Sequence, residues 1–242
     1  REYITWADDG SGRQNVTLMV QVPDSFNPAA PCIITATSSG SRGIYGAVSA
    51  GGEWGLKRGC AVAYTDKGTG NGFHDLMTGT VTARNGTLLN AASAGTDSLF
   101  TADLSGDALA AFNAATPNRV AYKHAHSQQN VEKDWGRNTL DAVRFAFYVL
   151  NERFGKDSPS QPGRKLVTIT THNTTVIAAG VSNGGGAALA AAEQDTEHLI
   201  DGVAVNEPNT QTHRTPGFGI QQGSTPVARV GRSLADYFTL AN

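Results

Sequence analysis

The chain has 242 residues, of which 39% are hydrophobic and 17% are charged. This length suffices for one α/β domain with a large buried core, and no apolar run approaches the roughly 20 residues that a membrane-spanning helix needs. The net charge of −2 excludes a strong field for recruiting nucleic acid or an anionic membrane surface, so a small, weakly polar ligand fits this chain better.

The first part of the chain alternates strands with a helix and a loop of small residues. Residues 15–22 place four apolar side chains on one face, with Thr17, Met19 and Gln21 on the other, and predict an antiparallel strand. The largely apolar run at 31–37 predicts a strand buried on both faces. A loop follows at 38–43, then a predicted helix at 47–58 and another buried strand at 60–65.

Cys32 and Cys60 each begin one of these buried runs. If the two runs are neighbouring parallel strands, both sulfur atoms lie at the same edge of the sheet and can form a disulfide. The alternative is two free, buried thiols that act as small hydrophobic side chains. Two cysteines are too few for a disulfide-rich scaffold or a cysteine-based metal site, and the sequence predicts no metal and no other cofactor.

The stretch 66–137 differs from its surroundings in its scattered glycines and polar tracts, and it holds one Ala-rich segment, 108–115, that is predicted to be helical. A connection of this length is either functional or disordered. We interpret it as an insertion that passes over the edge of the sheet at which catalysis occurs.

Regular alternation returns after this insertion. Apolar residues at helical spacing predict a helix over 138–154, and a buried strand follows at 174–179. A Gly-rich turn at 180–186 then leads to a helix at 187–194 and a strand at 199–205. This order predicts an α/β fold with a mostly parallel sheet, helices on both faces and right-handed crossovers.

The segment around residue 182 carries the clearest chemical signal. Gly180, Ser182 and Gly184 form a Gly-x-Ser-x-Gly pattern between a strand and a helix, which is typical of a nucleophile elbow. A phosphate-binding loop would need a lysine in this turn, and a dinucleotide-binding loop would need its glycine pattern near the first strand. We therefore predict Ser182 as the acyl-forming nucleophile of a serine esterase with an α/β-hydrolase-like fold.

The oxyanion hole is predicted from the same fold. The backbone N–H of Asn183 follows the nucleophile at the start of a helix. Ser39 and Gly40 lie where the loop after the third strand should supply the second backbone donor. The alternative is that these small residues only form the turn into the next helix.

The sequence does not identify the histidine and the carboxylate that would activate Ser182. Both follow the serine in this fold, but His198 starts a strand at the wrong end of the sheet, and His213 comes too early for the usual histidine loop. His172 precedes the elbow strand at that same wrong end of the sheet. His74, His124 and His126 lie in the stretch 66–137 and are expected either to line the cleft or to be structural. The base and its carboxylate are expected beyond Asn242, so that 1–242 is the N-terminal part of one catalytic domain whose sheet is cut short.

Longer stretches of the chain resemble one family, the D-(−)-3-hydroxybutyrate oligomer hydrolases. The resemblance spans nearly the whole chain, and its most specific stretches are 180–189, 192–195, 123–130, 134–137, and 65–68 with Gly70. It implies a carboxylesterase that cleaves 3-hydroxybutyrate oligomers or dimers to monomers in poly(3-hydroxybutyrate) degradation, with Ser182 as the charge-relay serine. It also implies a longer, secreted protein, extracellular or periplasmic, although no signal peptide is visible from Arg1 onward.

The expected ligand is then a small ester with one terminal carboxylate, and Arg42 or Arg137 is a candidate partner for that carboxylate. The alternative for each arginine is a solvated or structural role. Two other functions stay open: another secreted esterase, acting on phenolic or polyester substrates, and a non-catalytic hydrolase-fold domain that holds a ligand. No nucleic-acid or membrane partner is predicted, and the sequence does not indicate an oligomeric state.

Overall fold

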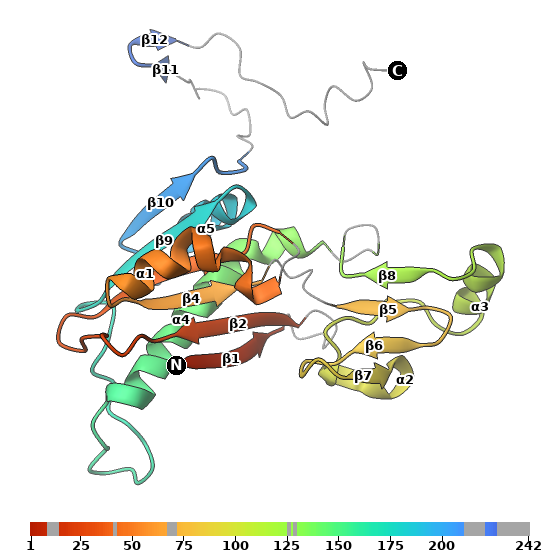
Figure 1. The fold of residues 1–242 in the computed structure, drawn as a ribbon, viewed down its shortest axis with the longest axis horizontal. Helices are drawn as coiled ribbons and strands as arrows, with labels where there is room; N and C mark the ends of the chain where they lie inside the picture. Colours follow the sequence, from red (N-terminus) through yellow and green to blue (C-terminus); the bar gives the residue numbers. More distant parts are fainter. Residues whose placement is uncertain are drawn as a thin grey trace. The chain divides into compact units, whose positions relative to one another are not determined.

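Residues 1–208 form one structural unit of the computed structural model and contain a six-stranded and a four-stranded sheet (Figure 1). The structure describes residues 1–8, 15–40, 43–66, 72–124, 127, 130–210 and 221–226. Residues from 209 onward make up a second unit, in which β11 (Gln221–Gln222) and β12 (Thr225–Pro226) form an antiparallel hairpin.

The six-stranded sheet has the order β1-β2-β4-β3-β9-β10 (Figure 1). Its strands are β1 (Glu2–Ala7), β2 (Val16–Gln21), β3 (Cys32–Thr37), β4 (Ala61–Thr65), β9 (Thr175–Val181) and β10 (Gly202–Asn206). Four neighbouring strands of this sheet pair in parallel, in the order β4-β3-β9-β10. β2 pairs with β4 in antiparallel fashion, and β1 pairs with β2 in the same way. All the predicted strands are therefore present, and β1 is an addition that the sequence did not predict.

Helices cover both faces of this sheet. On one face, α4 (Trp135–Phe154) packs against α5 (Asn183–Gln194), and Val143 and Leu150 of α4 are buried in a cluster with Val20 and Ile33. Amphipathic spacing correctly predicts α4 because its apolar residues recur on the side that meets the sheet.

The opposite face is covered by η1 (Gly43–Ala47), η2 (Val48–Gly52) and α1 (Glu53–Lys57). Successive residues of β4 divide between the two faces: Ala63 belongs to the cluster under α4, and Tyr64 to the cluster under η1 and η2. Since both faces of β4 are buried, its sequence is a continuous apolar run rather than an alternating one.

The helical stretch predicted over 47–58 is present from Val48 to Lys57, but it is not α-helical throughout. Val48–Gly52 is a π-helical turn, and only Glu53–Lys57 is α-helical. A Cβ atom on Gly52 would lie 2.0 Å from the hydroxyl oxygen of Tyr64, so this segment lies almost directly on the sheet. Packing of backbone against β4 therefore decides the local winding, which a residue-by-residue helix prediction does not capture.

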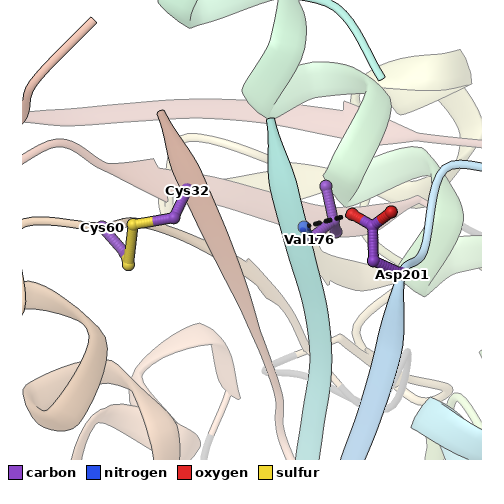
Figure 2. Close-up of a disulfide and its surroundings, with 4 residues drawn as sticks. All are labelled: Cys32, Cys60, Val176 and Asp201. Atoms are coloured by element: carbon purple, nitrogen blue, oxygen red, sulfur yellow. Dashed lines mark hydrogen bonds between the residues drawn. A yellow bond between two sulfur atoms is a disulfide. The ribbon is translucent and has the colours of Figure 1, made fainter. Parts of the chain in front are cut away.

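Cys32 and Cys60 form a disulfide between the amino ends of β3 and β4 (Figure 2). The bridge is the first of the two alternatives for these residues, and it closes the crossover that contains α1. On the other side of β3, the carboxylate of Asp201 accepts a hydrogen bond from the N–H of Val176, at 2.8 Å (Figure 2). Both contacts fix the amino ends of neighbouring parallel strands.

The four-stranded sheet lies within the stretch interpreted as an insertion and has the order β7-β6-β5-β8 (Figure 1). Its antiparallel strands are β5 (Phe73–Asp75), β6 (Thr80–Thr82), β7 (Leu88–Asn90) and β8 (Val120–Tyr122). The connections contain α2 (Ala91–Ala94), η3 (Gly95–Asp97) and the predicted helix, α3 (Gly106–Ala115), and η5 (Val131–Asp134) leads into α4.

Buried polar contacts join the two sheets. The side-chain amide of Asn15, just before β2, donates to the carbonyl oxygens of Thr96 and Ser98 at 2.8 and 2.7 Å. The ammonium group of Lys123, just after β8, donates to the carbonyl oxygen of Asn15 and is only 1% exposed. These contacts hold the four-stranded sheet beside the first two strands of the larger one.

Within the part of the chain that the structure describes, no helix is both long enough and apolar enough to cross a membrane.

Candidate active site

Ser182 lies alone at the turn between β9 and α5, at the carboxyl end of the parallel strands. Its φ and ψ angles are 57° and −124°, a conformation that costs a non-glycine residue about 1–3 kcal/mol. The N–H of Ser182 donates to the carbonyl oxygen of Asn206 at 3.0 Å, and its own carbonyl accepts from the N–H of Gly186 at 3.1 Å. The neighbouring strand and the first turn of α5 thus hold the strained residue, whose side chain is exposed.

The glycines on either side of Ser182 lie where no side chain fits. A Cβ atom on Gly180 would be 2.3 Å from the carbonyl oxygen of Gly184, and a Cβ atom on Gly184 would be 2.3 Å from the carbonyl oxygen of Thr37. Both contacts are with backbone atoms, which cannot move aside as a flexible side chain can. The close approach of β9, α5 and β3 therefore requires the spacing of the Gly-x-Ser-x-Gly pattern.

The turn is shorter than the sequence predicts. Instead of a turn over 180–186 and a helix from residue 187, β9 continues to Val181 and α5 begins at Asn183. Glycines favour a loop on helix propensity alone, but here they let the first turn of α5 pack directly against the end of β3.

The predicted oxyanion residues come together beside Ser182. The side-chain amide of Asn183 donates to the carbonyl oxygen of Ser39 at 3.0 Å, which ties the start of α5 to the loop after β3. That loop is anchored in turn, because the N–H of Ser38 donates to the carbonyl of Thr65 at 2.9 Å. The N-terminus of an α-helix carries the positive end of the helix dipole, so the start of α5 beside this loop suits a developing negative charge.

Ser39, Gly40 and Asn183 all line one large cleft. Its volume is about 1520 Å³, above the roughly 300–1,000 Å³ of an ordinary small-molecule site. The lining also includes the buried Asp66 and Lys123, and apolar side chains from both sheets. The lining thus mixes apolar with polar and charged side chains, and it reaches Asn183, the residue next to Ser182. A mixed lining of this kind suits a weakly polar ester.

The four-stranded sheet gives the cleft an exposed apolar wall. Directly paired residues of neighbouring strands share a face, and the face that carries Phe73 and Tyr122 also carries Leu88 and Val120. Leu88 and Tyr122 are each 61% exposed, and all four side chains line the cleft. The opposite face is buried, as Val81 shows with 0% exposure.

His74 lies on that buried face and not in the cleft. Its Nδ1 atom accepts the N–H of Ala102 at 3.2 Å, and its Nε2 atom is buried without a hydrogen-bond partner among the described residues. Burial lowers the pKa of His74, which keeps the imidazole neutral at neutral pH. A neutral imidazole on the face that does not line the cleft is a structural residue of the second sheet.

His124 is the one described histidine that lines the cleft. His172 and His198 precede β9 and β10, so they lie at the amino ends of these strands, opposite to Ser182. His126 and His213 lie outside the described residues. Within the described ranges, no group of three or more His, Cys, Asp or Glu residues is placed to hold a metal ion.

Of the two candidate carboxylate partners, the structure describes only Arg137, which does not line the cleft. Arg137 pairs with Asp134 at 3.6 Å and lines a separate, small cavity, and Arg42 lies outside the described residues. A different arginine, Arg84, lines the cleft. Sequence reasoning missed Arg84 because the hairpin that carries it has strands of only three residues, too short to show a periodic pattern.

The chain is similar over its full length to proteins of one known family. Residues 1–242 match the family model described as 3HB-oligomer hydrolase (3HBOH). A protein named D-(−)-3-hydroxybutyrate oligomer hydrolase from Burkholderia thailandensis is 63% identical over 242 residues, which are 100% of this chain and 34% of that protein. The protein of the same name from Polaromonas naphthalenivorans is 61% identical over 241 residues, again 100% of this chain and 34% of the relative.

The chain thus spans about a third of the length of the curated relatives it matches. Among solved structures, a glucuronoyl esterase from Solibacter usitatus is similar over 84% of this chain and 50% of its own, with 10% identity and a TM-score of 0.35. A likeness at that level carries no weight for fold or function. The match of the family model over all 242 residues and the identity to the named relatives show that the chain belongs to the 3HB-oligomer hydrolase family.

Proposed function

We propose that this chain supplies the nucleophile and the oxyanion hole of a serine carboxylesterase that hydrolyses 3-hydroxybutyrate oligomers or dimers to monomers. The observation that carries the proposal is the elbow at Ser182, a strained, exposed serine between two glycines that backbone contacts hold in place. The names of relatives that are 61% and 63% identical support the choice of substrate.

The proposed reaction is acyl transfer in two steps. The Oγ atom of Ser182 attacks the ester carbonyl carbon and gives up its proton to a base, and the carbonyl oxygen becomes an oxyanion. The N–H of Asn183 and an N–H of the Ser39–Gly40 loop stabilise that charge. The alcohol end of the next unit leaves with a proton, and water then hydrolyses the acyl-enzyme. Each oxyanion donor is expected to contribute about 10²–10³ in kcat.

The identity of the base is a separate question from that of the nucleophile. His124 lines the cleft, but in α/β-hydrolases the histidine follows the serine in the chain. We therefore assign His124 to the cleft wall and expect His124→Asn to lower kcat by less than about 10-fold, against about 10⁴-fold or more for loss of a triad member. A loss with His124→Asn as large as with Ser182→Ala would make His124 the base.

We place the chain in a single α/β-hydrolase-type catalytic domain, with the stretch 66–137 as its insertion. Support for this comes from the order of the parallel strands, with the elbow after the inner strand β9, and from the helices on both faces. In this proposal the four-stranded sheet is the part of the insertion that shapes the substrate cleft.

Secretion is part of the same proposal. The Cys32–Cys60 disulfide supports it, because disulfides persist mainly in oxidising compartments such as the periplasm and the extracellular space. Mass spectrometry of the protein isolated from culture fluid or periplasm, without reductant, is expected to find this pair oxidised.

Turnover of two esters by the protein at full length tests the proposed activity. We expect kcat/KM for the 3-hydroxybutyrate dimer to exceed that for a phenolic ester such as methyl ferulate by at least about 100-fold, and Ser182→Ala to lower kcat by about 10⁴-fold or more. Preference for the phenolic ester would indicate a different esterase. Turnover of neither ester, with binding of the dimer retained, would indicate a non-catalytic binding domain.

A further inference from the structure

Arg84 lies at the tip of the hairpin between β6 and β7, at the edge of the cleft. It lines the cleft together with Asn85 and Gly86. Backbone hydrogen bonds close the tip: the N–H of Gly86 donates to the carbonyl of Ala83 at 2.9 Å, and the N–H of Arg84 donates to the carbonyl of Asp97 at 2.9 Å. The main chain of Arg84 is therefore fixed on two sides.

Two further contacts orient the guanidinium group of Arg84. Its Nη2 atom contacts a carboxylate oxygen of Asp97 at 2.5 Å, and its Cζ atom lies 5.4 Å from the centre of the Trp6 ring. A guanidinium has five N–H donors in a rigid fork, so one bond to Asp97 leaves donors for an incoming carboxylate. The side chain is 37% exposed, so a ligand in the cleft can reach it.

Lys123 is the other permanently charged cation in the described lining of the cleft, but it is buried rather than exposed. Lys123 is 1% exposed, and its ammonium group donates to the carbonyl of Asn15 where the two sheets join. It presents almost no surface to a ligand. Among the described residues of the lining, Arg84 is therefore the permanent cation with surface to offer a substrate.

The chemistry of the proposed substrate matches this arrangement. A 3-hydroxybutyrate oligomer is a chain of methyl-bearing units with a single carboxylate at one end. The exposed apolar wall that carries Leu88 and Tyr122 suits the methyl-bearing chain, and the same hairpin that carries Leu88 carries Arg84. A charged end and an apolar body thus find their counterparts on neighbouring parts of one wall.

We propose that Arg84 binds the terminal carboxylate of the oligomer, and that the enzyme is consequently selective for oligomers with a free acid end. The inference rests on the proposed function of the cleft and adds to it the residue that recognises the chain end. The geometry also gives Trp6 a role, since its ring lies close enough to the guanidinium group to attract it.

Kinetics on a matched pair of substrates, with the protein at full length, tests this proposal. The pair is the 3-hydroxybutyrate trimer and its terminal carboxamide, which has the same ester bonds without the negative charge. We expect the wild type to turn over the acid with a kcat/KM about 10–100-fold higher than the carboxamide. Arg84→Gln is expected to raise KM for the acid by that factor, with kcat nearly unchanged and with no effect on the carboxamide.

The matched control is Arg58→Gln. Arg58 also lies over a tryptophan ring, with its Cζ atom 4.1 Å from the centre of the Trp54 ring, but it does not line the cleft. This variant is expected to behave as the wild type on both substrates. If Arg84→Gln does not fold, Arg84→Lys is measured instead, because lysine keeps the positive charge but lacks the paired N–H donors of the guanidinium group. Its ratio of kcat/KM for the acid to that for the carboxamide is expected to lie between 1 and the wild-type ratio.

The outcomes separate this inference from the proposed function. Equal turnover of acid and carboxamide by the wild type, or an equal loss on both substrates in Arg84→Gln, would overturn the role of Arg84 while oligomer hydrolysis stands. An equal loss is also what is expected if another part of the protein covers this wall. Turnover of neither substrate by the wild type would instead refute the proposed function.

Discussion

Removal of the Cys32–Cys60 disulfide is expected to lower stability and to leave catalysis unchanged. The bridge joins residues 28 positions apart, and the chain entropy that a loop of this length removes from the unfolded state corresponds to about 3.6 kcal/mol at 25 °C. For a chain of this size, that loss lowers Tm by about 7–14 °C. The cysteines lie at the amino ends of their strands, opposite to the loop that carries Ser39, so the cleft keeps its shape.

Urea unfolding of the wild type and of the variant Cys32→Ser/Cys60→Ser, each with and without dithiothreitol, measures this effect. The reduced wild type is expected to match the double variant, and dithiothreitol is expected to have no effect on the variant. The kcat and KM values for the dimer at 25 °C should agree among all forms. A stability loss below about 1 kcal/mol, or a change in KM, would refute the view that the bridge acts on the unfolded chain and away from the site.

Two further substitutions test the packing of the elbow and the buried histidine. Gly184→Ala places a methyl group 2.3 Å from the carbonyl oxygen of Thr37 and is expected to lower the free energy of unfolding by about 3 kcal/mol or more. Gly202→Ala meets only the end of a flexible side chain, the Cδ1 atom of Ile177 at 3.2 Å, and should lower it by less than about 1 kcal/mol. Equal losses of the two variants in urea unfolding would contradict this packing. Burial lowers the pKa of His74 below its ordinary 6.5 in the folded state only, so the unfolded chain binds a proton more readily. The free energy of unfolding of the wild type should therefore fall by up to about 1.4 kcal/mol per pH unit as pH falls below 6.5. The His74→Asn variant should lack this contribution to the pH dependence of stability. If the free energies of unfolding of the two proteins differ by the same amount at pH 7.5 and at pH 5.5, His74 does not have a lowered pKa in the folded state.

The buried strands of the large sheet are predictable because their burial leaves a local trace in the sequence. β3 and β4 are largely apolar since helices cover both faces, and α4 shows apolar residues at helical spacing since one side meets the sheet. β1 leaves a weaker trace. It is an edge strand whose residues are exposed or half-buried, so no apolar alternation marks it.

The elbow is predictable for a different reason, which is steric. Gly180 and Gly184 are needed because backbone atoms occupy the space of their side chains, and this requirement acts within a few residues of Ser182. The cleft depends instead on contacts between distant segments. Arg84 lines it where the two sheets meet, beside contacts made by Asn15 and Lys123, and nothing near Arg84 in the sequence records those contacts.

The central claim, that Ser182 is the nucleophile, is tested most directly by covalent labelling with a fluorophosphonate, followed by peptide mapping by mass spectrometry. We expect one adduct per active molecule on the peptide that contains Ser182, slower labelling in the presence of the 3-hydroxybutyrate dimer, and no adduct at this site in Ser182→Ala. An active protein that is labelled at another residue, or that resists labelling altogether, would contradict the account.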